Sequence, residues 1–374
     1  MASNLEEDNA KTVEKHYNSL KEGSLMERGQ SRIVYMRNFN NWMKSQLISM
    51  YLNKIRETKK SKIITVLDLC SGKGGDQLKW RKGGVEHVTF ADIAGESVRQ
   101  SEQRYHEMKS RMSKERHNNQ VIYSAEFITA DCGRELLTKH YKSPIIFDLC
   151  SCQFSLHYSF ESFKQAEIMI RNACERLRPN GYFIGTTTDA NEIIKRLRKS
   201  KDETNSFGND VFSVTFDKDF KKNGTPALFG GRYDFHLEGV VDCPEFLIHF
   251  DTLVTMVEKY HMKLVLKKKF SEFYKEQIAN SDGRGLIGRM QGLETYPPPE
   301  SENLVGNPET DYETAKNLVK DLREKGLEKD LTDNEMAKQI SVGTLSQPEW
   351  EACTLYMVFA FQKDKNAPMP SSSL

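Results

Sequence analysis

The sequence predicts a doubly wound α/β domain whose sheet is mainly parallel. Five short runs rich in Ile, Val and Phe alternate with segments of helical length. Strands separated in this way need crossover connections, which place helices on both faces of a parallel sheet. A glycine loop follows the first run, at the edge where such sheets bind ligands. The five runs are 63–69, 87–93, 125–131, 145–152 and 182–187.

Composition and charge restrict the class of protein. The chain has 374 residues, of which 38% are hydrophobic and 29% charged, and this length favours one large domain with insertions or two small ones. Because the net charge is +1, a polyanion must be bound by a local basic cluster. No apolar run is long enough for a membrane span. Because the first thirty residues also lack the apolar centre of a signal peptide, we expect an intracellular protein. Its 7 cysteines are odd in number and scattered, which favours reduced thiols.

Helices are expected where apolar residues recur at helical spacing between the strands. The clearest covers 41–55 and starts near Trp42. The helix over 163–177 must stop before Pro179, because proline cannot continue a helix. The other expected helices cover 13–20, 97–112, 189–198, 245–260 and 314–325.

Two capping patterns mark helix starts. Asp189, with Glu192 three residues later, resembles a capping box. Asp242 and Pro244 suggest a second start, which would place Glu245 in the first turn of the helix over 245–260. Glu245 would then have an ordinary structural role.

The chain divides into an arm, one domain and a tail. Residues 1–30 are polar and are expected to form an arm without core residues, and 364–374 a flexible tail. The domain covers 31–363, with a β insertion or lid over 207–239 and a weakly apolar surface excursion over 281–341 that carries one helix. The remaining expected strands are 211–216, 228–237, 263–270 and 354–361.

The glycine loop at the first strand can be assigned by elimination. It is not a Walker loop, because Leu67 stands where such a loop needs its first glycine. It is not a dinucleotide fingerprint, because Gln77 stands where a small residue must let the helix pack closely. What remains is an acid, Asp68, followed by Gly72 and Gly74, which let the backbone contact a ligand without a pyrophosphate. This suits the amino-acid end and ribose of S-adenosylmethionine.

Two further acids end the next strands. Asp92 can accept hydrogen bonds from both ribose hydroxyls, as in many nucleoside-binding α/β folds, and Asp131 could accept from the adenine amine. Either alone could be a solvated turn aspartate, but the combination with the glycine loop favours a cofactor site. A structural zinc site is not expected, because Cys150, Cys152 and His157 lack a second cysteine pair.

Three longer motifs resemble those of the mRNA cap guanine-N7 methyltransferases, and the resemblance covers nearly the whole chain. The motifs are 38–44 (NFNNWMK), 72–80 (GKGGDQLKW) and 152–160 (CQFSLHYSF), supported by 16–18 (HYN), 238–246 (EGVVDCPEF) and 356–361 (YMVFAF).

The resemblance implies a Rossmann-like class I methyltransferase sheet with an antiparallel last strand, and methyl transfer from S-adenosylmethionine to N7 of the guanine in a GpppN RNA end. It implies capped RNA as substrate, possible association with capping machinery or an activating subunit, a monomeric catalytic chain and a nuclear location. With Asp68 and Gly72 of the loop, the implied cofactor residues are Lys44, Cys70, Asp92, Asp131, Gln153, Phe154 and Tyr158. The implied cap residues are Asn40, Asn41, Lys73, Lys79, Arg104, His157, Glu245 and Tyr356.

Two departures from the family pattern are visible. Many relatives have glycine where this chain has Cys70, whose sulfur could crowd the methionine moiety. A long basic N-terminal extension is absent, so only the weak basic cluster 59–62 supports nuclear targeting.

The implied chemistry needs alignment more than proton transfer. Guanine N7 carries a free lone pair at neutral pH, so no catalytic acid or base is expected, and positioning alone can remove roughly 7 to 11 kcal/mol of barrier. Glu245 would accept from guanine N1 and N2 and favour the developing positive charge. Lys73, Lys79 and Arg104 would contact the triphosphate. The alternatives are a methyltransferase for another RNA base or a small molecule, or a non-catalytic cap-binding scaffold, which Cys70 would favour.

Overall fold

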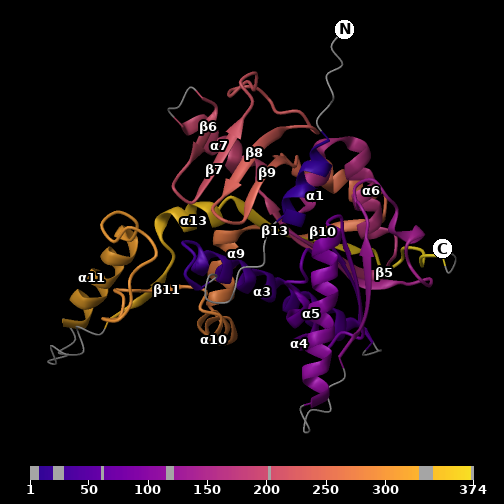
Figure 1. Ribbon diagram of the computed structural model, residues 1–374, viewed down its shortest axis with the longest axis horizontal. Coiled ribbons are helices and arrows are strands. Elements are labelled where there is room, and N and C mark those ends of the chain that lie inside the picture. The colour runs from indigo at the N-terminus through magenta and orange to yellow at the C-terminus, as the bar shows by residue number, and fades with distance from the viewer. Residues whose placement is uncertain are drawn as a thin grey trace.

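The main sheet of the computed structural model has seven strands in the order β10-β13-β5-β4-β1-β2-β3 (Figure 1). The structure describes residues 8–19, 29–59, 63–114, 122–200, 204–327 and 340–371. The strands are β1 Thr65–Leu69, β2 His87–Asp92, β3 Ser124–Thr129, β4 Phe147–Gln153, β5 Leu177–Thr188, β10 Met262–Lys269 and β13 Tyr356–Lys363.

The strand directions confirm the predicted fold class. Neighbouring strands among β1 to β5 pair in parallel, whereas β13 runs antiparallel to β5 and β10 runs antiparallel to β13. The sheet is therefore mainly parallel, and its last strand is antiparallel. No helix in the described ranges combines the length and apolarity needed to cross a membrane.

Helices pack on both faces of this sheet and create two hydrophobic cores. The helices are α1 Asn9–Ser19, α3 Val34–Thr58, α4 Gln77–Lys82, α5 Gly95–Lys114, α6 Phe163–Cys174, α7 Ala190–Lys199, α8 Phe250–Glu258, α9 Phe270–Ile278, α10 Ser281–Arg289, α11 Glu313–Leu327 and α13 Gln347–Cys353. Alternate strand residues face opposite sides, so Leu149 of β4 lies in one core and Cys150 in the other. Helix α3 fills the first core with the buried Trp42 and Tyr51.

A second sheet covers part of the first core. It consists of β6 Ser206–Gly208, β7 Phe212–Phe216, β8 Arg232–Leu237 and β9 Val241–Phe246, paired antiparallel in this order. Val214, Tyr233 and Phe235 on its inner face are buried in the first core. Figure 1 shows this sheet at the top of the view, beside α1.

The prediction that a helix begins near Asp242 was wrong. Residues Val241–Phe246 form β9, and the helix begins only at Phe250, where His249 accepts from Thr252 N. Pro244 is compatible with β9 because this strand lies at the edge of its sheet. An edge strand tolerates proline, since one of its sides has no neighbouring strand that would need the missing N–H. Glu245 is therefore a strand residue.

Two other segments differ from expectation. Helix α6 ends at Cys174, earlier than predicted, because Leu177 already pairs with Phe147 of β4. Residues 178–181, around the proline expected to stop this helix, form an irregular part of β5 in which Asn180 has φ 61°.

The stretch 281–341 contains more structure than the one expected helix. Besides α11 it includes α10 and β11 Glu294–Tyr296, which pairs with β12 Val342–Thr344. Trp42 Nε1 donates to Gly283 O at 3.0 Å, so α10 packs on α3. In contrast, α11 lies at the far left of Figure 1, away from the main sheet.

Candidate active site

The carboxyl ends of β1 to β4 open into a first cavity of about 280 Å³. β1 lies between β4 and β2, which is the point where the strand order reverses and where such sheets bind ligands. Every residue predicted to contact the cofactor lines this cavity. These residues are Lys44, Asp68, Cys70, Gly72, Asp92, Asp131, Gln153, Phe154 and Tyr158.

Asp92 fastens the glycine loop to the end of β2. Its Oδ2 accepts from Gly72 N at 2.8 Å and its Oδ1 from Ala94 N at 2.9 Å. Burial raises the pKa of Asp92, although the two N–H donors oppose this shift. Gly72 has φ 51°, a left-handed conformation that glycine adopts without strain. Cys70 adopts φ 52° and also lines the cavity.

A charged cluster of Lys44, Asp76 and Lys79 lies next to the glycine loop. Asp76 Oδ1 pairs with Lys44 Nζ at 2.8 Å and with Lys79 Nζ at 2.7 Å. Burial alone would raise the pKa of Asp76, but the two ammonium groups outweigh burial and lower it. Asp68 accepts from Trp80 Nε1 at 2.8 Å, and burial, with the nearby Asp76 charge, raises the pKa of Asp68 to about 8.

A second cavity of about 220 Å³ adjoins the first. Tyr17, Lys44, Phe154 and Tyr158 line both cavities, so these four side chains stand where the two meet. The rest of the wall comes from α3, the second sheet and β13. It includes four of the predicted cap residues, Asn40, Asn41, Glu245 and Tyr356.

Glu245 is the only carboxylate among the residues lining the second cavity in the described part of the chain. It is 2% exposed. Its Oε2 accepts from Tyr233 OH at 2.8 Å, and its Oε1 lies 3.2 Å from His157 Nε2. These contacts come from β8 and from the segment after β4, so neighbouring side chains fix the carboxylate against the cavity wall.

The comparisons with known proteins identify the family. The sequence-family model of the mRNA (guanine-N(7))-methyltransferase domain matches residues 1–364. The chain belongs to this family. It is 44% identical to the mRNA cap guanine-N(7) methyltransferase of Drosophila melanogaster over 96% of this chain and 78% of the relative. The mRNA cap guanine-N(7) methyltransferase of Caenorhabditis elegans is 37% identical over 95% of this chain and 87% of the relative. The mRNA cap guanine-N(7) methyltransferase 1 of Oryza sativa subsp. japonica is 33% identical over 97% of this chain and 84% of the relative.

The other predicted cap residues of this methyltransferase lie outside the cavity walls. In the described part of the chain, Lys73, Lys79, Arg104 and His157 line neither cavity. Lys79 Nζ also donates to Asn41 Oδ1 at 3.3 Å, Arg104 Nη1 donates to Lys73 O at 2.8 Å, and His157 lies behind Glu245. Lys79 and His157 therefore contact residues of the second cavity's wall, and Arg104 contacts the glycine loop at Lys73.

Helix α1 supplies methyltransferase site residues that the sequence reasoning missed. Asn9, Val13 and Tyr17 line the first cavity, and Val13 is buried, contrary to the expected arm without core residues. Asn9 Nδ2 donates to Glu161 Oε1 at 2.7 Å, which ties the helix to the domain. The HYN motif at 16–18 is the sequence signal that marks this helix, whereas the polar composition of residues 1–30 predicts an arm without core residues. Residue 20 of the predicted helix lies outside the described residues.

Tyr17→Phe is expected to lower kcat/KM for the cap about fivefold. The Tyr17 hydroxyl lies 3.1 Å from the Tyr158 hydroxyl where the cavities meet, and a lost hydrogen bond costs about 1 kcal/mol. Steady-state methylation of GpppA measures this effect. Tyr105→Phe is the matched control, because Tyr105 OH donates to Tyr123 O at 2.7 Å outside both cavities. Equal losses in the two variants would exclude a specific role of Tyr17.

Proposed function

We propose that this chain transfers the methyl group of S-adenosylmethionine to N7 of the guanine cap of mRNA. The observation that carries the proposal is the pair of adjoining cavities. One is lined by the residues expected to contact the methyl donor, and the other by Glu245 and Tyr356. Two molecules bound there would meet at Tyr17, Lys44, Phe154 and Tyr158.

The first cavity suits S-adenosylmethionine, which supplies an activated methyl group on a sulfonium. Gln153 Oε1 and Ser71 Oγ are buried in its wall without a hydrogen-bond partner among the described residues, so a polar ligand would satisfy them. Each Asp92 oxygen accepts one backbone N–H and keeps a lone pair that can accept a ribose hydroxyl. Asp131 can accept the adenine amine, because its Oδ1 accepts from Gly133 N at 2.9 Å and its Oδ2 lies 3.5 Å from Arg134 Nε, which leaves each oxygen a lone pair.

The second cavity suits a guanine because of Glu245. Guanine N1 and N2 both carry hydrogens, and a carboxylate can accept from both. When N7 is alkylated the base becomes cationic, and a fixed carboxylate in a buried wall stabilises this developing charge without reorganising. Tyr233 and His157 hold Glu245 in place before the reaction, and Tyr356 forms part of the same wall.

The residues at the junction align the reactants, and no general base is required because N7 has a free lone pair. Phe154 and Tyr158 would exclude water from the contact between the two molecules. The Lys44 ammonium pairs with Asp76 and lines both cavities, so it would offer a positive charge to either bound molecule. Lys73, Lys79 and Arg104 would act on the triphosphate beyond the cavity wall. Alignment alone can supply roughly 7 to 11 kcal/mol of the required barrier reduction.

Incubation with labelled S-adenosylmethionine and GpppA, GTP or uncapped RNA tests the proposal. We expect methylation of GpppA and GTP at N7 and none of uncapped RNA. Methylation of uncapped RNA would favour the alternative RNA-base acceptor. Binding of S-adenosylmethionine without product would favour a cap-binding scaffold.

The proposal extends to the setting of the enzyme. Because caps are added to nascent transcripts, we place the chain in the nucleus, where it would act as a monomeric catalytic chain, either alone or with capping machinery or an activating subunit. Imaging of a fluorescent fusion and light scattering of the purified chain test these two points. A wholly cytoplasmic signal or a stable dimer would contradict them.

A further inference from the structure

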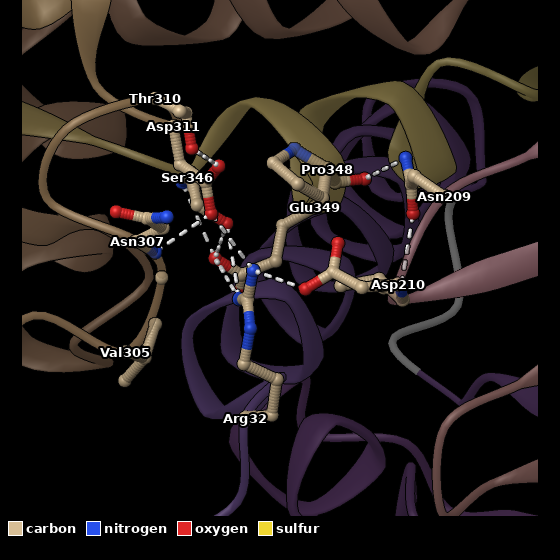
Figure 2. Close-up of polar contacts among 12 residues, drawn as sticks. Arg32, Asn209, Asp210, Val305, Asn307, Thr310, Asp311, Ser346, Pro348 and Glu349 are labelled. Carbon is tan, nitrogen blue, oxygen red and sulfur yellow. Dashed lines mark hydrogen bonds and ion pairs between the residues drawn. The ribbon is translucent and has the colours of Figure 1, made fainter.

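A polar joint centred on Arg32 lies outside both cavities and takes no part in the proposed chemistry (Figure 2). The Arg32 joint consists of Arg32, Asp210, Asp311, Ser346 and Glu349. The Arg32 guanidinium donates to Ser346 Oγ at 3.2 Å and to Asp311 Oδ2 at 3.2 Å. It also donates to Asp210 Oδ2 at 3.3 Å and lies 3.9 Å from Glu349 Oε2.

The joint connects four segments that are far apart in the sequence. Arg32 precedes α3, Asp210 precedes β7, Asp311 precedes α11, and Ser346 with Glu349 begins α13. Figure 2 shows the Arg32 side chain between Asp210 on one side and Asp311 and Ser346 on the other. One planar guanidinium therefore holds these segments together, which a point charge on a lysine cannot do equally well.

Three of these four segments adjoin elements that form the wall of the second cavity. Helix α3 supplies Asn40 and Asn41, β9 of the second sheet supplies Glu245, and β13, which follows α13, supplies Tyr356. The wall of the first cavity comes mostly from the ends of β1 to β4 and from α1. A change at the Arg32 joint should therefore move the second cavity more than the first.

Two further hydrogen bonds connect the elements around the joint directly. Glu349 is fully buried, and its Oε1 accepts from Met36 N at 3.1 Å, so it is fixed to α3 directly. Asn209, next to Asp210, donates from Nδ2 to Glu351 Oε2 at 2.9 Å and so fastens the second sheet to α13. Within this cluster, the buried Glu349 and the nearly buried Asp311 both face the positive charge of Arg32.

We propose that Arg32 is a positioning residue for the methyl acceptor. By holding α3, the second sheet and α13 together, it sets the spacing of Asn40, Glu245 and Tyr356 around the guanine. The inference rests on the proposed function, because it assigns the second cavity to the cap.

The test compares Arg32→Lys and Asp210→Asn with the wild-type chain. Each variant is assayed for the KM of GpppA at saturating S-adenosylmethionine and for the Kd of S-adenosylhomocysteine by calorimetry. We expect Arg32→Lys to raise the KM about tenfold, the effect of one lost charge-assisted contact, while the Kd changes less than about twofold. Asp210 is 62% exposed, so Asp210→Asn should fold normally and raise the KM about two- to threefold.

The matched control is Arg171→Lys, because Arg171 pairs with Glu175 on the surface of α6 and lines neither cavity. Its KM and Kd should not change. An unchanged KM in both test variants, or equal changes in KM and Kd, would overturn the inference. If Arg32→Lys does not fold, the KM and Kd of Asp210→Asn alone test the inference. Absence of methylation by the wild-type chain would contradict the proposed function instead.

Discussion

Glu245→Gln is expected to lower kcat/KM for the cap by about 10²- to 10³-fold, the range found when one fixed electrostatic contact to a transition state is removed. The amide keeps the size of the side chain but loses the negative charge and presents an NH₂ to guanine donors. Because Glu245 lies outside the first cavity, the Kd of S-adenosylhomocysteine should not change. Methylation of GpppA and calorimetry measure the two quantities.

The control for this substitution is Glu126→Gln. Glu126 is also a buried strand carboxylate, 8% exposed, and accepts from Lys142 N at 2.9 Å outside both cavities. Its variant should keep full activity. If Glu245→Gln stays active and only its melting temperature falls, then Glu245 has a purely structural role and the guanine assignment is wrong.

Asp92→Ala is expected to weaken binding of S-adenosylhomocysteine by at least about 100-fold. Two hydrogen bonds to a charged acceptor, each contributing roughly 1.5 to 3 kcal/mol, would be lost with the carboxylate. The Gly72 N–H would also lose its acceptor, so the glycine loop would loosen and the melting temperature would fall. Calorimetry measures the affinity, and thermal unfolding the stability.

Asp234→Ala serves as the control, because Asp234 is 55% exposed on β8 and pairs only with Arg232 among the described residues. It should bind S-adenosylhomocysteine like the wild-type chain. Near-normal affinity in Asp92→Ala, with the folded state verified, would contradict the placement of the ribose at Asp92.

The sequence was sufficient for the parts of the site that are local in the chain. Asp68 lies near the end of β1, Gly72 follows that end, and Asp92 is the last residue of β2. The geometry of parallel sheets brings such strand ends together. This is why the three acids and the glycine loop line one cavity, whereas Lys44 reaches it from α3 and Tyr158 from the segment after β4. Cys70 was recognisable as unusual, but only the structure shows that it adopts φ 52° at this wall.

The second cavity was harder to predict because its wall comes from distant segments. Asp242 and Pro244 are typical of a helix start, and only pairing with β8 makes Val241–Phe246 a strand. Lys79 could be assigned to a phosphate from its position near a helix start, whereas the structure pairs it with the buried Asp76. Helix α1 is polar in composition, and its role depends on contacts with Tyr158 and Glu161 that no local pattern encodes.

A crystal structure with S-adenosylhomocysteine and GpppA tests the arrangement of the two ligands most directly. We predict the nucleoside in the first cavity, the guanine against Glu245 and Tyr356, and N7 facing the sulfur at about 5 Å, which leaves a methyl carbon about 3 to 3.5 Å from its acceptor. A guanine bound elsewhere, or bound with N7 turned away from the sulfur, would contradict the account.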